Sequence, residues 1–353
     1  MGKPKIGLIG MGMIGALHGR FLSGMKEVQF VAASDANPNL GHLADLWGVP
    51  FYPDYRTMLE REKLDGVVVA VPNKLHQPVT EDCVSRGLHV LLEKPISDDL
   101  ETADAIIASA RRMNVHLLVA HHRRFNPGLE RVREAIRNKE IGDLLGVSIL
   151  WALHKPEDYF KGPFSWRAKK GGGPIRINLI HEIDMLRYVC GEIKSVYAEV
   201  SHIGRGFEVE DTLGITIRLE GDRIATIFFT DSAPSDIGYE ANTGENEFFF
   251  HYPQNCYLFF GKKKTLKFPS MELLYYENAE KQGWHDPLVR TGIKIVLENP
   301  YERQLRHFGK VIDGLEEPRC TGEDARETLR ATLAIEESAR SRSPLTLNYS
   351  EHR

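Results

Sequence analysis

The stretch KIGLIGMGMIGALHGRFLSGM, residues 5–25, joins an apolar run to a helix-like run through glycines spaced as GxGxxG. Residues 5–9 suit a buried strand, and residues 16–25 suit a helix. A glycine-rich turn between a strand and a helix is typical of a mononucleotide-binding βα unit. This stretch therefore predicts that the chain opens with a Rossmann-type domain.

Each glycine of the turn has its own physical role. Gly10 permits the tight bend, Gly12 lets the backbone approach a pyrophosphate, and Gly15 lets helix and strand pack closely. Met13 and Ile14, between the second and third glycines, are expected to contact the cofactor. The free N–H groups and positive potential at the start of the helix favour phosphate. The alternative is a glycine turn with a structural role alone.

The first third of the chain alternates strand-like and helix-like runs. This rhythm predicts a doubly wound parallel sheet over residues 1–122. The further strands are expected at 29–34, 51–52, 66–71, 89–93 and 116–120, and the further helices at 38–47, 76–87 and 99–113.

The rhythm changes beyond residue 122. Residues 193–276 contain strand-like segments without intervening helices, among them EFFFHY at 247–252, which indicates a mainly antiparallel sheet. Residues 123–353 are therefore expected to form an α+β domain with a large, open sheet. Its helices are expected at 127–138, 180–189, 300–314 and 322–339, and a strand at 144–153.

Asp35 ends the second predicted strand, twenty residues beyond Gly15. A carboxylate there accepts hydrogen bonds from the adenosine ribose hydroxyls and repels a 2′-phosphate. Ala36 and Asn37 follow it and offer no cation to a phosphate. NAD is therefore the expected cofactor, rather than NADP.

Two further strand ends carry polar residues, and ligands of doubly wound sheets bind at such carboxyl ends. Pro72 and Asn73 follow one strand, and His76 either borders the cofactor or only starts a helix. Glu93 and Lys94 follow the next strand. A partly desolvated lysine handles protons near neutral pH, whereas an exposed loop lysine does not.

Bulk composition excludes several classes of protein. The chain has 353 residues, 27% of them charged, and a formal net charge of -4, without the basic excess typical of a nucleic-acid binder. No apolar run approaches the roughly 20 residues of a membrane span. The four cysteines are far apart in sequence, which argues against a disulfide framework and favours a cytoplasmic location.

As a set, the motifs of this chain resemble the Gfo/Idh/MocA family (glucose–fructose oxidoreductase, inositol dehydrogenase and rhizopine catabolism). The resemblance covers nearly the whole chain. It rests on GLIGMGMIG at 7–15, VPNKLH at 71–76, EKP at 93–95, HHRRFNP at 121–127 and GGGPIRINLIHEIDMLRYVCG at 171–191.

The resemblance implies that Lys94 is the catalytic lysine and that His181 faces the reacting hydroxyl. Many members of the family have Asp four residues before this histidine, whereas this chain has Ile177, with Asn178 as the nearest polar residue. Asp184 lies one helical turn beyond His181. It either serves the site or has a structural role as a cap or ion-pair partner.

Further candidates for substrate contact come from aromatic and hydrogen-bonding residues, which suit a sugar ring. Arg124 either binds a carboxylate or only ties the domains together. No cluster with zinc-ligand spacing is present in the sequence, so no metal is expected. The remaining candidates lie before the glycine run or in a late loop, and they are Trp151, His154, Lys155, Tyr159, Trp166, Arg167 and His285.

The family's members mostly oxidise a secondary hydroxyl of a sugar or cyclitol, or reduce the ketone, and many form dimers or tetramers through the open sheet. The resemblance therefore implies a sugar or cyclitol substrate and a homodimer or homotetramer. Asp35 favours NAD, and the charge and the apolar runs of the chain predict no nucleic-acid or membrane partner. Two alternatives remain open. One is NAD-dependent glycoside cleavage by transient oxidation and elimination, and the other is a non-catalytic NAD-binding sensor.

Overall fold

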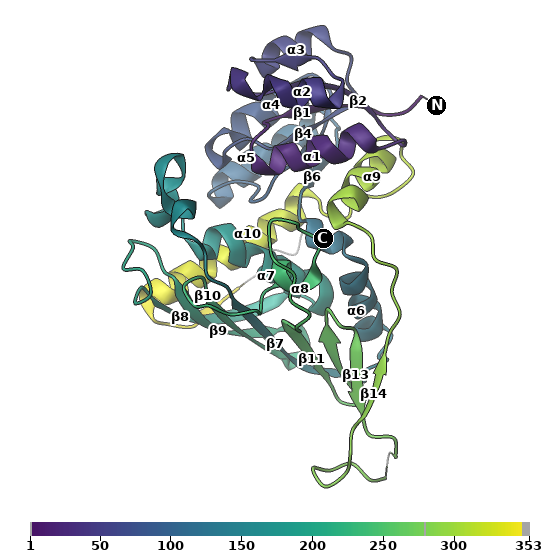
Figure 1. Cartoon of the computed structure of the whole chain (residues 1–353), viewed down its shortest axis with the longest axis vertical. Helices are drawn as coiled ribbons and strands as arrows, with labels where there is room; N and C mark the ends of the chain where they lie inside the picture. The colour runs from purple at the N-terminus through teal and green to yellow at the C-terminus, as the bar shows by residue number, and fades with distance from the viewer. Residues whose placement is uncertain (1, 279, 348–353) are drawn as a thin grey trace. The chain divides into compact units, whose positions relative to one another are not determined.

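A computed structural model describes residues 2–278 and 280–347 and divides the chain into two compact units (Figure 1). Among the described residues, unit 1 comprises residues 2–125 and 298–330, and unit 2 comprises residues 126–278, 280–297 and 331–347. The first segment thus ends three residues beyond the domain boundary expected at residue 122. Residues 298–330, expected in the second domain, pack with unit 1.

Unit 1 contains a six-stranded parallel sheet in the order β3-β2-β1-β4-β5-β6. Every residue of β4 is buried, as in a parallel strand covered on both faces. The parallel, doubly wound sheet predicted from the sequence is confirmed. Its strands are β1 Lys5–Ile9, β2 Gln29–Ser34, β3 Phe51–Tyr52, β4 Gly66–Val69, β5 His89–Leu92 and β6 Leu117–Val119.

Helices flank this sheet, and α9 explains the return of the chain to unit 1. Leu305, Phe308 and Val311 of α9 enter the same core as Ile6 and Leu8 of β1. An amphipathic helix is stable where its apolar stripe is covered, and here the sheet of unit 1 covers it. The helices are α1 Met13–Gly24, α2 Gly41–Trp47, α3 Tyr55–Arg61, α4 His76–Ser85, α5 Leu100–Arg112 and α9 Pro300–Ile312.

Unit 2 contains a nine-stranded sheet in the order β14-β13-β12-β11-β7-β10-β9-β8-β15. All neighbours run antiparallel except β7 and β10, which run parallel. The predicted large, mainly antiparallel sheet is confirmed. Its strands are β7 Leu144–Ala152, β8 Ile193–Ser201, β9 Thr212–Leu219, β10 Ile224–Thr230, β11 Tyr257–Gly261, β12 Thr265–Phe268, β13 Glu272–Tyr275, β14 Val289–Gly292 and β15 Leu345–Thr346.

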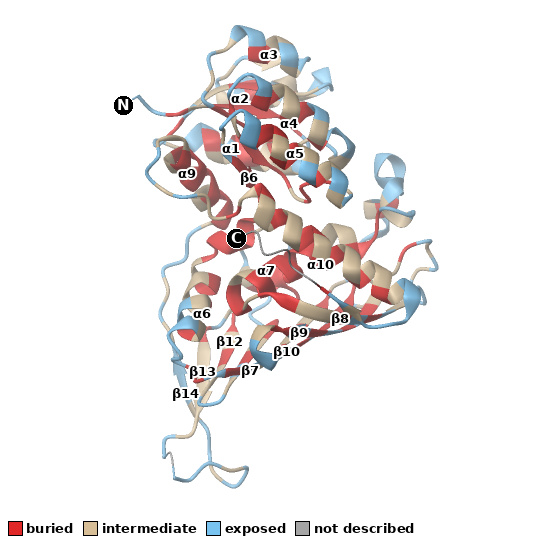
Figure 2. Cartoon of the chain, turned by 180° about the vertical axis from the view of Figure 1, so that it is seen from behind, coloured by how far each residue is buried: buried red, intermediate tan, exposed pale blue. Residues whose placement is uncertain are grey.

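Helices cover one face of the unit 2 sheet and leave the other open. The helices of this unit are α6 Pro127–Arg137, α7 Ile180–Cys190, α8 Tyr239–Thr243 and the second half of α10 Gly322–Ser341. Burial alternates along β9, with every second residue exposed. Helix α7 is buried almost throughout, including its ionisable residues His181, Glu182, Asp184 and Arg187 (Figure 2).

The strand predicted at 247–252 is wrong, because these residues form an irregular loop between α8 and β11. Phe248 and Phe250 are 63% and 76% exposed, so their strand-favouring side chains do not pack on the sheet. Among the described residues, the helices are too short or too polar to cross a bilayer.

Candidate active site

The glycine turn after β1 has the geometry that a bound pyrophosphate requires. Gly10 has a φ of 93°, and a side chain at Gly15 would place its Cβ 2.0 Å from the Gly10 carbonyl oxygen. At Gly12, by contrast, an added Cβ meets no atom within 4 Å. The backbone is thus open where a phosphate would approach. Gly12 also begins α1 without a side-chain cap, which leaves the first N–H groups of the helix available to an anion.

Asp35 lies directly beside this turn. One carboxylate oxygen accepts the Met11 N–H at 2.6 Å, and the other accepts the Asn37 N–H at 2.8 Å. These bonds fix the carboxylate at the carboxyl end of β2, where a ribose would lie next to the phosphates. The residues of unit 1 therefore fit NAD.

The loop after β4 is tied to the loop after β5 by His76. The imidazole nitrogens of His76 lie 2.9 Å from the Pro95 carbonyl oxygen and 3.0 Å from the Val71 carbonyl oxygen. Burial lowers the pKa of this histidine. Asn73 donates to the Asp98 carboxylate at 3.2 Å. The structure thus uses the His76 ring to join two loops at the cofactor edge of the sheet.

Glu93 and Lys94 follow β5, two strands away from the glycine turn in the same sheet. Glu93 is buried and accepts a hydrogen bond from His18 Nε2 at 2.8 Å and from the Lys94 backbone N–H at 3.1 Å. Burial alone would raise the pKa of Glu93, but the His18 hydrogen bond and the charges of His18, Lys94 and His122 hold it below its ordinary value. Glu93 is therefore held as a carboxylate beside Lys94.

Sequence reasoning missed the partners of Glu93. His18 lies on α1, one turn beyond Gly15, and is completely buried. Its ring meets the edge of Tyr301, on which His122 stacks with ring centroids 4.2 Å apart. The only signal in the sequence was a histidine on a helix face that must pack on the sheet.

Arg124 is engaged within unit 1. Its guanidinium donates to the Arg319 carbonyl oxygen at 3.1 Å and forms a short ion pair with Asp324. Since both partners belong to unit 1, these bonds fix the turn at residues 122–125 to the region where α10 begins.

The candidates on α7 and the turn before it share one part of unit 2. His181 and Asp184 lie one turn apart on α7 and are both buried. Asn178 lies in the preceding π-helical turn, Ile175–Leu179, and its Oδ1 accepts a hydrogen bond from Lys155 Nζ at 2.7 Å. The structure thus brings Asn178, His181 and Asp184 together on consecutive turns.

The loop before this turn carries the aromatic candidates. The Arg167 guanidinium lies 3.9 Å from the centroid of the Tyr159 ring and 4.3 Å from that of Phe164. Trp166 is half-exposed, and His154 Nδ1 lies 3.2 Å from the Ser232 carbonyl oxygen. These contacts hold the loop together and leave Trp166 accessible.

His285 is not brought together with these residues within unit 2. It lies in the connection between β13 and β14, and this connection extends away from α7 at the far end of the sheet (Figures 1 and 2).

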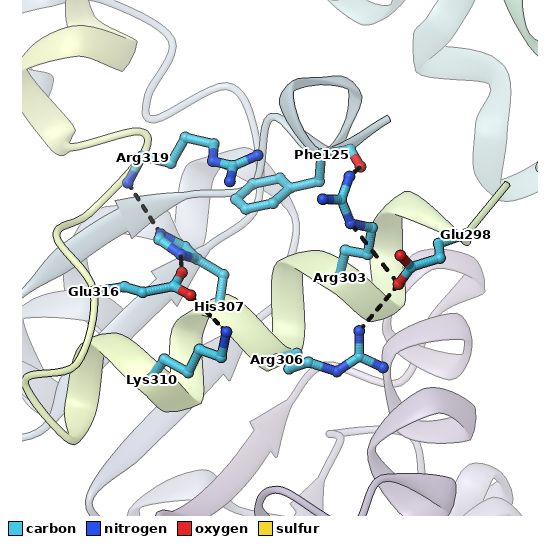
Figure 3. Close-up of a pocket in the computed structure, with 8 residues that line it drawn as sticks. All are labelled: Phe125, Glu298, Arg303, Arg306, His307, Lys310, Glu316 and Arg319. Carbon is cyan, nitrogen blue, oxygen red and sulfur yellow. Dashed lines mark hydrogen bonds and ion pairs between the residues drawn. The ribbon is translucent and has the colours of Figure 1, made fainter. Parts of the chain in front are cut away.

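A pocket of about 200 Å³ in unit 1 is distinct from the candidate cofactor edge (Figure 3). Its charged side chains pair with one another, since Glu316 binds His307 and Lys310 at 2.6 Å each, and Glu298 lies 3.3 Å from Arg306. The lining residues are Phe125, Glu298, Arg303, Arg306, His307, Lys310, Glu316 and Arg319. None of the sequence-predicted site residues is among them.

Comparisons with known proteins agree with this geometry. Residues 4–121 match the family model described as "Oxidoreductase family, NAD-binding Rossmann fold", and residues 129–266 match "GFO/IDH/MocA C-terminal domain". Myo-inositol 2-dehydrogenase of Thermotoga maritima is 25% identical over 344 residues, covering 95% of this chain and 96% of that protein. 1,5-Anhydro-D-fructose reductase of Ensifer adhaerens is 28% identical over 278 residues, covering 78% of each.

One solved structure shows how widely the fold is shared. An oxidoreductase from Agrobacterium radiobacter, in complex with NAD+, L-tartaric acid and magnesium, superposes with a TM-score of 0.81 at 18% identity, covering 98% of each chain. This likeness concerns the fold alone.

Proposed function

The chain belongs to the Gfo/Idh/MocA family of NAD-binding oxidoreductases, and from this premise we propose that it transfers a hydride between a sugar or cyclitol and NAD. The reacting group is a secondary hydroxyl, or the corresponding ketone, of the sugar, sugar derivative or cyclitol. The full-length relative named for myo-inositol oxidation supports this substrate class.

The observation that carries the proposal is the placement of Lys94 in the sheet that holds the glycine turn. Strand β4 separates β1 from β5, so the ends of the two outer strands lie about 10 Å apart. A dinucleotide whose phosphates lie at the glycine turn can extend along this edge toward Lys94. The lysine therefore suits a group that acts beside the nicotinamide.

NAD, when bound, supplies the hydride acceptor. In the proposal, Lys94 Nζ or the His181 imidazole accepts the proton of the reacting hydroxyl as general base. The Glu93 carboxylate accepts the Lys94 backbone N–H at 3.1 Å and so holds the start of the loop that carries this lysine. Asn178 and Asp184 orient the substrate or His181 from the neighbouring turns.

A homodimer or homotetramer forms part of the same proposal. Ile224 and Phe260 lie opposite Gly146 on the two sides of β7, so both point to the same face of the sheet. With Tyr197 and Phe228, they place four exposed apolar side chains on the face without helices. Exposed apolar side chains gathered on one face of a sheet are typical of an interface. A cytoplasmic location, favoured by the cysteine usage, is proposed with it.

The test is a screen for NADH formation with myo-inositol, monosaccharides, anhydrosugars, sugar acids and glycosides, with NAD and NADP in parallel. We expect NAD-linked turnover of one polyol class and a loss of at least about 100-fold in Lys94→Ala, since general acid–base catalysis contributes 10²–10⁴-fold. Glycoside cleavage that needs NAD without net NADH would replace the proposal by redox recycling. Tight NAD binding without any turnover would instead indicate a sensor.

A further inference from the structure

The parallel pair of strands in unit 2 brings two charged residues to one edge of the sheet. Ala152, the last residue of β7, lies opposite Thr230, the last residue of β10. Asp231 directly follows β10, and Lys155 follows β7 by three residues. The Lys155 backbone N–H donates to the Asp231 carbonyl oxygen at 2.9 Å. Because the two strands run parallel, both side chains leave the sheet at the same end.

The Lys155 ammonium group is built into a network at this edge. Its Nζ donates to Asn178 Oδ1 at 2.7 Å and lies 3.0 Å from Asp231 Oδ2. The Arg205 guanidinium binds the other oxygen of the same carboxylate at 3.1 Å. The Asp231 side chain is fully buried, and that of Lys155 is only 10% exposed. One carboxylate thus serves two cations.

Stability alone gives a weak reason for an ammonium at this position. Removing a cation from water costs several kcal/mol, and an ion pair commonly fails to recover the cost. Arg205 already pairs with Asp231, so the carboxylate does not depend on Lys155. Burial lowers the pKa of Lys155, and Arg205 and Arg167 shift it the same way, against the attraction of Asp231. Buried, perturbed cations of this kind cluster at functional sites.

The network also points toward the candidate substrate residues. Asn178 precedes His181 by three residues, so Lys155 reaches the helical turn next to that histidine. A lysine ammonium has three N–H donors. In the part of the chain that the structure describes, two of them have protein acceptors, Asn178 and Asp231. The same ammonium group also lies 4.9 Å from the centroid of the Tyr159 ring, and its third N–H has no hydrogen-bond acceptor among the described residues.

We propose that Lys155 is a substrate-binding residue whose third N–H donates a hydrogen bond to a hydroxyl oxygen of the sugar or cyclitol. This inference rests on the proposed function and assigns a defined contact to one residue of the candidate loop before the glycine run. Asp231 and Asn178 are positioning residues, because they orient the ammonium group without touching the substrate.

The test uses Lys155→Met in the full chain, with the polyol that wild type oxidises in the screen above. We expect KM to rise about 10- to 100-fold, the effect of losing a hydrogen bond from a charged donor. The NADH dissociation constant, measured by nicotinamide fluorescence, is expected to stay unchanged. Lys161→Met is the matched control, since Lys161 lies on the same loop with a side chain 67% exposed. It is expected to leave KM unchanged.

A second pair of variants separates binding from folding. Lys155→Arg keeps the charge and is expected to recover part of the affinity for the polyol. Lys155→Ala is expected to gain kcat/KM on addition of propylammonium, which replaces the deleted atoms, whereas a purely structural lysine would show no such rescue.

The outcomes distinguish this inference from the function on which it rests. Two results overturn the role of Lys155 and leave the dehydrogenase proposal intact. In the first, wild type turns over a polyol and Lys155→Met has an unchanged KM. In the second, Lys155→Met has a lower kcat with an unchanged KM, and propylammonium does not rescue Lys155→Ala. If wild type neither oxidises any polyol of the panel nor gives a saturation-transfer signal for myo-inositol with NADH present, the proposed function fails and the inference falls with it.

Discussion

His18→Leu tests whether a buried hydrogen bond from His18 holds Glu93 as a carboxylate beside Lys94. The His18 side chain is fully buried and that of Glu93 is 10% exposed, with the two polar atoms 2.8 Å apart. Leucine removes the partner but leaves the carboxylate in the same apolar surroundings. Breaking a buried pair in this way costs about 3 kcal/mol, the lower end of the range measured for such pairs.

The loss should depend on pH with a defined sign. In the wild type the folded-state pKa of Glu93 lies below its ordinary value, so the stabilisation is present above that value and is lost as pH falls through the folded pKa. Without His18, burial raises the pKa of Glu93, and ionising it then opposes folding. The stability difference between wild type and variant is therefore largest near neutral pH and shrinks as the solution becomes acidic.

Native-state hydrogen exchange of the β5 amides measures this difference within unit 1. We expect the opening free energy of β5 to fall by about 3 kcal/mol at about pH 7.5 and by less than half of that near pH 4.5. His42→Leu is the control. The His42 ring makes one exposed contact to a backbone carbonyl, and its loss should cost under about 0.5 kcal/mol.

The double variant His18→Leu/Glu93→Leu completes the argument. Replacing both partners by apolar residues removes the unpaired charge, so most of the lost stability should return. An equal loss at both pH values, or a double variant no more stable than His18→Leu, would refute the reasoning.

Three other expectations concern the cofactor and the assembly. Gly15→Ala should abolish NAD binding and lower the melting temperature, because its Cβ would lie 2.0 Å from a backbone oxygen. Gly12→Ala should fold normally and bind NAD more weakly. Equal losses of melting temperature in the two variants would contradict this difference. The double variant Asp35→Ser/Ala36→Arg should raise the ratio of kcat/KM for NADP to kcat/KM for NAD by about 10-fold or more. Serine keeps an acceptor near the Met11 N–H, and arginine binds a 2′-phosphate. An unchanged ratio would count against the role of Asp35. Phe228→Glu should reduce the mass seen by light scattering to the 40.0 kDa of one chain, while Phe250→Glu, off the sheet, should not; a wild-type monomer would defeat the proposed assembly.

Most of unit 1 was predictable from the sequence because its signals are local. A parallel strand buried on both faces reads as a continuous apolar run, as GVVV at 66–69 does, and the glycine turn carries its own spacing. The order of these runs predicts the doubly wound sheet. The predicted family, fold class and NAD-binding domain are confirmed by the two family models and the sheet topology.

The return of residues 298–330 to unit 1 was not predictable in the same way. The apolar positions Leu305, Phe308 and Val311 indicate an amphipathic helix, but periodicity does not say which sheet covers it. The strand at 247–252 was predicted wrongly because local propensity does not show whether a partner strand is present. Its three phenylalanines favour a strand by propensity, yet no strand in the described part of the chain pairs with them.

The polar networks depend on contacts between residues far apart in sequence. Glu93 lies 75 residues beyond His18, and Lys155 meets Asp231 only because β7 and β10 are parallel neighbours. No spacing rule connects such residues. The roles of Lys94 and His181 stay predictions, as do those of the other candidate site residues.

The most direct test of the central claim follows the hydride itself. The polyol identified in the screen, deuterated at its carbinol carbons, is incubated with wild type and NAD, and the reduced cofactor is analysed by mass spectrometry. The account predicts one deuterium per NADH formed, and no detectable labelled NADH with Lys94→Ala over the same time. Reduced cofactor without deuterium, or full labelling with the Lys94 variant at the wild-type rate, would contradict it.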